Sequence, residues 1–241
     1  TVPDKDGKSK NISFDPVTRN LRGCALAGED RITLAGMMER FFHQVRELVE
    51  GLLPTYGRTL RDGLASFRPL EVKGRRSSVL KDDARLHVDA FVSRPNQGLR
   101  ILRVFSNVNL DGQPRVWELG EPFDSVADRF RERVPRQIPG SAWLLERLHI
   151  TKGRRSEYDH IMLGLHDHMK RDVRYQESAP RVRIDIAAGS TWVCFSDCVS
   201  HAVLSGQHLL EQTFYLPVAA MQDEGCAPLR ILEQRYQRKL V

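Results

Sequence analysis

Cysteine and long apolar runs are both scarce in this sequence. The four cysteines are too few and too scattered for a disulfide framework, so we expect reduced thiols and a cytoplasmic protein. No apolar run approaches the roughly 20 residues that a membrane-spanning helix needs. The opening residues contain no apolar core of a signal peptide, and we expect further residues to precede Thr1.

The chain also lacks internal repeats and low-complexity linkers, which indicates a single domain over residues 1–241. Hydrophobic residues make up 41% of the chain and charged residues 28%, as is typical of a protein that buries a core. The formal net charge is +6, and arginine provides most of the positive charge. Such a surplus favours an anionic partner: nucleic acid, anionic lipid or an acidic metabolite.

Short strands dominate the expected secondary structure. A helix over residues 30–53 shows apolar residues at helical spacing behind an Asp30 N-cap. Asp111-Gly112 is expected to form a hairpin turn. Further strands are expected over residues 63–72, 84–93, 98–109, 114–119, 181–197 and 199–218, and further helices over residues 121–134, 140–150 and 156–175. The order predicts an α+β fold with a mainly β core, flanking helices and a helical insertion at about 122–180.

A His-x-Asp pair lies in the strand expected over residues 84–93, and a single histidine lies far downstream. Because strand side chains alternate between faces, His87 and Asp89 should point the same way while Val88 points away. Two histidines and one carboxylate on one face of an octahedron are typical of non-haem Fe(II) oxygenases, which keep the opposite face open for co-substrates. We therefore expect His87, Asp89 and His201 to bind Fe(II).

Two other groups of residues could be read as metal sites. Cys194 and Cys198 precede His201 at spacings close to those of zinc sites, but Cys194 lies within an expected strand and a closed zinc site usually has four ligands. His166 and His168 are two residues apart in an expected helix, where they do not face each other. We interpret these two histidines as solvated helix residues, with His160 or His166 as a candidate for the mouth of a substrate site.

Five segments extend the metal pattern: KNISFDP, RLHVDAF, RILRVFSNVN, PRVWELGEPF and HLLEQTFYLPV. Together they resemble the Kdo hydroxylase family of Fe(II)/2-oxoglutarate-dependent dioxygenases, over residues 10–232. The resemblance implies a double-stranded β-helix, the jelly-roll fold of the cupins. It also implies that Fe(II), 2-oxoglutarate and O2 are used to hydroxylate C3 of a 3-deoxy-D-manno-oct-2-ulosonic acid (Kdo) sugar of Kdo2-lipid A, giving succinate and CO2. No catalytic residue is implied beyond the metal centre.

The cation that pairs with the distal carboxylate of 2-oxoglutarate is missing from its frequent place in this superfamily, because position 211 is Glu211. Arg103 is the expected replacement. Alternation along its strand groups it with Asn107 on one face, and a cation in so apolar a strand needs an anionic partner. Arg115 is the second candidate for this ion pair. Gln212 and Asn107 are expected to add hydrogen bonds to 2-oxoglutarate.

The substrate implied by the resemblance is an anionic glycolipid, because Kdo carries a carboxylate and lipid A is phosphorylated. Loops beside the metal-binding strand are placed to reach such a substrate, and we expect Arg76 and Arg94 to bind it. The resemblance further implies a cytoplasmic enzyme that contacts the inner face of the bacterial inner membrane peripherally. Nucleic acid is not an expected partner.

Two other functions stay open at the level of sequence. A nucleic-acid demethylase or prolyl hydroxylase of the same superfamily would share the metal ligands, but the chain has no arginine-rich motif after His201. Such a demethylase would bind DNA with a steep salt dependence. A non-enzymatic β-barrel that binds acidic sugars would leave the three metal-ligand residues unrelated and would consume no 2-oxoglutarate.

Overall fold

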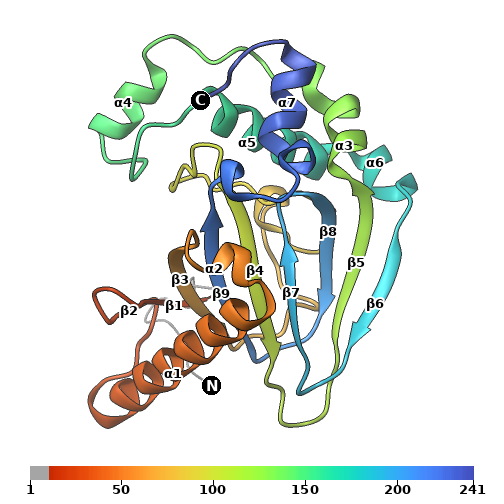
Figure 1. The fold of residues 1–241 in the computed structure, drawn as a ribbon. Helices are drawn as coiled ribbons and strands as arrows, with labels where there is room; N and C mark the ends of the chain where they lie inside the picture. The colour runs from red at the N-terminus through yellow and green to blue at the C-terminus, as the bar shows by residue number, and fades with distance from the viewer. Residues whose placement is uncertain (1–10) are drawn as a thin grey trace.

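Nine strands form two antiparallel sheets in residues 11–241, the part of the chain that the computed structural model describes. The strands are β1 (Ile12–Asp15), β2 (Asn20–Arg22), β3 (Arg61–Arg68), β4 (Arg100–Asn107), β5 (Arg115–Pro122), β6 (Val182–Ile186), β7 (Thr191–Phe195), β8 (Val199–Ser205) and β9 (Leu209–Leu216). The first sheet has the order β2-β1-β3-β9-β4-β7, and the second has the order β6-β5-β8 (Figure 1). The helices are α1 (Gly28–Leu52), α2 (Pro54–Gly57), α3 (Phe123–Phe130), α4 (Ser141–Arg147), α5 (Glu157–Arg171), α6 (Val173–Ser178) and α7 (Pro228–Tyr236).

The longest helix, α1, covers one face of the six-stranded sheet. Its apolar stripe packs on that sheet, where Phe41 and Val45 share a core cluster with Leu102 of β4 and Phe214 of β9. The burial of this stripe accounts for its helical spacing in the sequence. Among residues 11–241, no helix is both long and apolar enough to cross a bilayer.

A second layer of helices gathers at one end of the sheets (Figure 1). Helices α3 to α6 lie between β5 and β6 in the chain, and α7 follows β9. Phe130 of α3, Leu165 of α5 and Leu232 of α7 belong to one core cluster, which Leu86 and Val88 also join. The loop before β4 is thus anchored between the helical layer and the sheets.

Residues 85–91 do not form the strand that the sequence predicts. Only His87 makes a ladder contact, in which its N–H donates to the His201 carbonyl at 3.0 Å and the His201 N–H donates back at 2.9 Å. The Gln176 side chain of α6 replaces a neighbouring strand at Leu86. Its Oε1 atom accepts the Leu86 N–H at 2.9 Å, and its Nε2 atom donates to the Leu86 carbonyl at 3.0 Å. The side chains nevertheless alternate as expected, since His87 and Asp89 line a pocket while the apolar residues beside them are buried among helices.

Two local predictions need correction. Gly112 has the φ of +73° that a turn at this place requires, but β4 and β5 belong to different sheets, so the connection is not a hairpin. Helix α1 starts at Gly28, and Ala27 precedes it without a side-chain cap. Asp30 lies in the first turn of the helix, where the positive end of the helix dipole stabilises its carboxylate.

A buried ion pair fixes the turn between β7 and β8. The Arg100 Nε and Nη2 atoms donate to the Asp197 carboxylate at 2.9 and 3.0 Å, and the Ile101 N–H donates to the same group at 3.2 Å. The two ion-pair side chains are 2% and 0% exposed. Next to this pair, the Ser196 carbonyl accepts the Asp89 N–H at 3.2 Å. The pair therefore supports the turn on which the Asp89 backbone rests.

Candidate metal centre and its pocket

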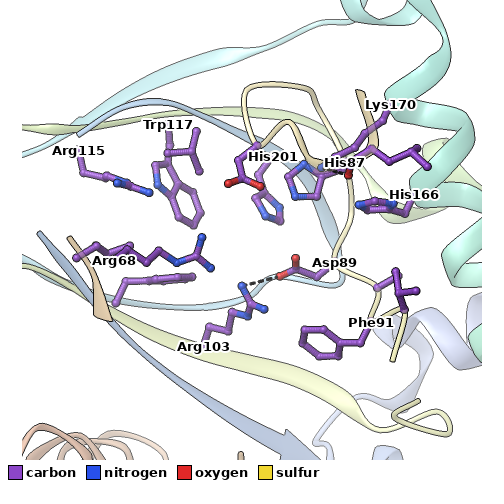
Figure 2. Close-up of a pocket in the computed structure, with 17 residues that line it drawn as sticks. Arg68, His87, Asp89, Phe91, Arg103, Arg115, Trp117, His166, Lys170 and His201 are labelled. Carbon is purple, nitrogen blue, oxygen red and sulfur yellow. Dashed lines mark hydrogen bonds and ion pairs between the residues drawn. The ribbon is translucent and has the colours of Figure 1, made fainter. Parts of the chain in front are cut away.

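Three side chains converge between the two sheets, as the sequence predicts. His87 and Asp89 come from the loop before β4, and His201 comes from β8. One ligand atom from each lies within 4.8 Å of the others, and they form the one such group of His, Cys, Asp or Glu residues within residues 11–241. Their exposed fractions are 7%, 9% and 4%. Figure 2 shows the three side chains meeting in the middle of the pocket.

Both imidazole rings are oriented for metal binding by their own backbone surroundings. The His87 Nδ1 atom lies 2.7 Å from the Arg85 carbonyl, and the His201 Nδ1 atom lies 3.2 Å from the Val199 carbonyl. A carbonyl only accepts hydrogen bonds, so both Nδ1 atoms carry the proton and both Nε2 atoms keep their lone pair. The Asp89 Oδ2 atom is buried and accepts no hydrogen bond from the described residues. This donor set fits a divalent metal ion.

The charge states of the centre also suit a metal ion. Burial, followed by the neighbouring His201, lowers the pKa of His87 well below its usual value. Burial likewise lowers the pKa of His201. Burial raises the pKa of Asp89, but the Arg103 guanidinium and the two histidines outweigh it and keep this pKa below its usual value. The centre therefore offers two neutral imidazoles and one carboxylate, the set used by non-haem Fe(II) sites.

Arg103 joins the metal centre to a network of charges. Its Nη1 atom lies 3.3 Å from Asp89, an ion pair that Figure 2 marks with a dashed line, and 3.4 Å from Glu211. Glu211 in turn accepts from the Arg68 Nε and Nη2 atoms at 2.9 and 2.6 Å. The acidic residue at position 211 thus orients two arginines toward the pocket. Arg103 and Phe105 both line the pocket, as the alternation along β4 predicts, while Leu102 and Val104 pack with α1 on the other face. The charge of Arg103 already has two carboxylates beside it.

Arg115 differs from the other arginines of the pocket. It is 2% exposed, and its Nη1 atom donates to the Gly206 carbonyl at 2.7 Å. No carboxylate of the described residues forms an ion pair with it, and its Nε atom has no hydrogen-bond partner among them. Burial, with the nearby Arg68 charge, lowers the pKa of Arg115 to about 10, although the more distant carboxylates of Asp83, Glu71 and Glu211 oppose this shift. A buried cation with no carboxylate within ion-pair distance is costly, so this part of the pocket suits an anionic ligand.

Two residues expected to bind 2-oxoglutarate are held elsewhere. Gln212 lies on the β9 face opposite Glu211, and its Nε2 atom donates to the Gly63 and Thr213 carbonyls at 3.2 and 2.8 Å. The Asn107 Nδ2 atom donates to the Gln113 carbonyl of the β4–β5 loop and to the Ile186 carbonyl of β6, both at 3.1 Å, so this side chain fixes backbone at the far end of β4. Neither side chain lines the pocket around the metal centre.

The expected substrate arginines also lie outside the pocket lining. Arg76 is exposed and Arg94 is half-buried, and neither is among the residues that line the cavity of about 240 Å³ around the metal centre. Arg94 does follow Phe91 and Val92, which line it. The loop thus reaches the pocket through its apolar residues.

Helix α5 brings two residues to the pocket: His166, one of the candidates for the substrate mouth, and Lys170, which the sequence analysis missed. His166 is 9% exposed and packs edge-on against His87 with ring centroids 5.4 Å apart, so its interpretation as a solvated residue is wrong. Lys170 is 2% exposed, and its Nζ atom donates to the Leu80 carbonyl at 3.2 Å. The spacing of four residues on one helix face was the available signal. Figure 2 shows both on the side of the centre opposite Arg115 and Arg68.

The cysteines do not form the alternative zinc site. Burial raises the pKa of the Cys194 thiol to about 12, so it stays protonated at neutral pH. The Cys198 thiol donates to the Phe195 carbonyl at 3.1 Å. Neither cysteine belongs to the one group of side chains within residues 11–241 that converge closely enough to hold a metal ion, so the zinc interpretation is wrong.

Comparisons with known proteins agree with this geometry. The family model described as 3-deoxy-D-manno-oct-2-ulosonic acid (Kdo) hydroxylase matches residues 3–239. Among solved structures, the chain is 47% identical to the Kdo hydroxylase KdoO, a non-haem Fe(II), α-ketoglutarate-dependent dioxygenase in complex with α-ketoglutarate and Fe(III). That match has a TM-score of 0.93 and covers 95% of this chain and 78% of the other.

Two further structures of KdoO give the same result. The complex with succinate and Fe(III) has a TM-score of 0.93 and covers 97% of this chain and 79% of that one, again at 47% identity. The complex with cobalt(II) has a TM-score of 0.94, at 47% identity, with coverage of 97% and 78%. A search of curated proteins found no match. From the family match and these structures, the chain belongs to the Kdo hydroxylase family of Fe(II)/α-ketoglutarate-dependent dioxygenases.

Proposed function

We propose that the protein hydroxylates C3 of a Kdo sugar in Kdo2-lipid A at the centre formed by His87, Asp89 and His201. The observation that carries the proposal is the arrangement of the pocket, in which a three-ligand centre lies between two cationic ends. The reaction has two carboxylic acids to place, 2-oxoglutarate and the sugar acid. A pocket with one cationic end on each side of the metal ligands suits both.

The three ligands would hold Fe(II) through the two Nε2 atoms and the Asp89 carboxylate. When bound, Fe(II) and 2-oxoglutarate would supply the oxidising chemistry with O2, with succinate and CO2 as the products of the co-substrate. The chain supplies position and shielding. Arg103 keeps Asp89 ionised, and the Trp117 ring stacks on His201 at 5.3 Å and 14°, which fixes the plane of that imidazole.

Arg115 is the residue that we propose pairs with the distal carboxylate of 2-oxoglutarate. Arg103 and Arg68 share Glu211 and Asp89 as counter-ions, whereas Arg115 has none within ion-pair distance among residues 11–241. A bound carboxylate would supply the missing counter-ion through the planar guanidinium. This proposal puts Arg115 before Arg103, whereas the sequence favoured Arg103 for this ion pair.

Lys170 and His166 are proposed to bind the carboxylate of the sugar. Besides burial, the charge of Lys170 helps to lower the pKa of both His87 and His201, which places its ammonium group near the metal ligands. It enters from α5, across the centre from Arg115 (Figure 2). The expected residue Arg94 is kept as a candidate for outer parts of the glycolipid, since Val92 of its loop lines the pocket.

Replacing Lys170 by methionine is expected to raise the KM for a soluble Kdo disaccharide by about 10- to 100-fold, because the variant loses a hydrogen bond to a charged group of the sugar. The KM for 2-oxoglutarate should stay within a factor of two or so, because that acid uses the opposite end of the pocket. Steady-state kinetics over both substrates measure the two values. Lys73→Met, which removes an exposed lysine, is the matched control. Equal rises in both KM values would mean that Lys170 stabilises the metal centre as a whole and does not bind the sugar.

The fold and location of the protein are proposed in the same way. The two antiparallel sheets would form a double-stranded β-helix in a single domain over residues 1–241, with residues 122–180 as a helical insertion that delivers α5 to the pocket. The enzyme would act in the cytoplasm and contact the inner face of the bacterial inner membrane. A glycolipid substrate, a sugar acid on a lipid anchor, supports this location.

The proposal is tested with a soluble Kdo disaccharide, Fe(II), 2-oxoglutarate and air. We expect the sugar to gain one oxygen atom by mass spectrometry, with one succinate formed per hydroxylated sugar. Short methylated DNA and a proline-containing peptide serve as comparison substrates and should gain none. Succinate formation with oxidation of either comparison substrate, and none of the sugar, would reject the sugar as substrate.

A further inference from the structure

The chain around α4 exposes an unusual number of large apolar side chains. No other stretch of this length in residues 11–241 exposes as many. Isolated exposed apolar residues are ordinary, but a cluster on one short segment marks an interaction site. We call residues 138–150 the apolar patch, and its exposed members are Ile138 (74%), Trp143 (57%), Leu144 (49%), Leu148 (59%) and Ile150 (55%).

Positive charge surrounds the apolar patch. Residues 134–156 contain five arginines and lysines and one acidic residue, Glu146. Four of these cations are exposed, and none of the four has an ion-pair partner among residues 11–241. The four are Arg136, Arg147, Lys152 and Arg154. Apolar side chains with tryptophan among them, bordered by unpaired cations, are the composition of an interfacial membrane contact.

The apolar patch lies beside the mouth of the metal pocket. The Arg155 Nη2 atom donates to the Val92 carbonyl at 2.8 Å, and the Lys152 N–H donates to the Ser93 carbonyl at 2.8 Å. Val92 is 59% exposed and lines the same pocket as Asp89, three residues earlier. In Figure 1, α4 stands out from the helical end of the molecule. The segment that carries α4 is thus tied to the pocket loop by one side-chain and one backbone hydrogen bond, both to carbonyls of that loop.

We propose that the apolar patch and its four exposed cations dock the protein on an anionic lipid bilayer, with Trp143 and its neighbours in the headgroup region. This inference rests on the proposed function, because a glycolipid in that bilayer would present its sugar next to the pocket mouth. The longer helix α1 does not offer such a surface, since its apolar stripe is buried on the sheet.

The charges favour a bilayer over a second copy of the chain. In a two-fold contact between identical patches, the unpaired cations of both copies would come together and repel. Anionic headgroups would instead attract and neutralise each cation. An anionic lipid surface satisfies both the apolar and the charged part of the patch.

The test is co-sedimentation with vesicles of phosphatidylglycerol and phosphatidylethanolamine, compared with vesicles of phosphatidylcholine alone. The wild type should bind the anionic vesicles and lose most of this binding in high salt. Trp143→Ser with Leu144→Ser should weaken binding by about 30-fold or more, from the lost apolar burial. Ile32→Ser, which changes an apolar residue of α1 that is 72% exposed, is the matched control and should bind as the wild type does.

Turnover of a soluble Kdo disaccharide by the same proteins reports on the pocket alone. A wild type that binds anionic vesicles but leaves the sugar unchanged would reject the proposed function and keep the docking surface. A double variant that binds vesicles as the wild type does, or a wild type that prefers neither vesicle, would overturn the docking surface. Light scattering that shows a dimer only in the wild type would assign the patch to contacts between copies instead.

Discussion

Replacing Asp89 by alanine is expected to weaken the binding of a divalent metal by at least about 100-fold and to abolish hydroxylation. Removing a residue that merely orients a metal ligand lowers the metal affinity by about 10- to 100-fold. Asp89 should matter more, because it is the one anionic ligand of the centre. Its loss also leaves Arg103 close to the metal with a single counter-ion, Glu211. Titration calorimetry with Co(II), which resists oxidation in air, measures the affinity.

Asp185→Ala is the matched control for this substitution. Asp185 is an exposed carboxylate of β6 that pairs with Arg183 at 2.8 Å, outside the pocket. The Asp185→Ala variant should bind Co(II) as tightly as the wild type does. Equal Co(II) affinity in Asp89→Ala and the wild type would mean that the three converging side chains are not the metal ligands.

Replacing Arg115 by methionine is expected to raise the KM for 2-oxoglutarate by about 10- to 150-fold, because a charge-assisted ion pair to the distal carboxylate is lost. The affinity for Co(II) should stay the same, since Arg115 contacts none of the three ligands. The KM for the Kdo disaccharide should also stay the same. These three measurements separate a co-substrate residue from a residue that supports the metal.

The stability of the same variant gives an independent check. Burial lowers the pKa of Arg115 from 12.5 to about 10, so the charged form opposes folding at neutral pH. Methionine at this position should therefore leave the free energy of unfolding unchanged or raise it, as measured in urea. If Arg115→Met keeps the wild-type KM while Arg103→Met raises it, the distal carboxylate belongs to Arg103, as the sequence first suggested.

The metal ligands could be predicted from the sequence because local geometry decides their direction. Side chains two residues apart in extended backbone point the same way, whether or not the segment pairs as a strand. His87 and Asp89 therefore both face the pocket, although their segment is not a strand. The same rule separated Arg103 from Leu102 and Val104, which pack with α1 on the other face of β4. It also could have excluded Gln212, since adjacent residues of β9 face opposite ways and Glu211 faces the pocket.

The partners of the charges could not be predicted in this way. Glu211 neutralises Arg68 of β3 and Arg103 of β4 because β9 pairs with both strands, a long-range arrangement that no local pattern reports. For the same reason the sequence could not show that Arg115 lacks a counter-ion. Lys170 escaped notice because its position in the pocket depends on how α5 packs on the sheets.

The most direct test of the account is the absorption spectrum of the protein with Fe(II) and 2-oxoglutarate in the absence of O2. A weak visible charge-transfer band should form in the wild type, vanish in His87→Ala, and require more 2-oxoglutarate in Arg115→Met. Lys170→Met should keep the band at the wild-type concentration, because Lys170 serves the sugar. A folded wild type without the band, or a band that persists in His87→Ala, would contradict an iron centre at these residues.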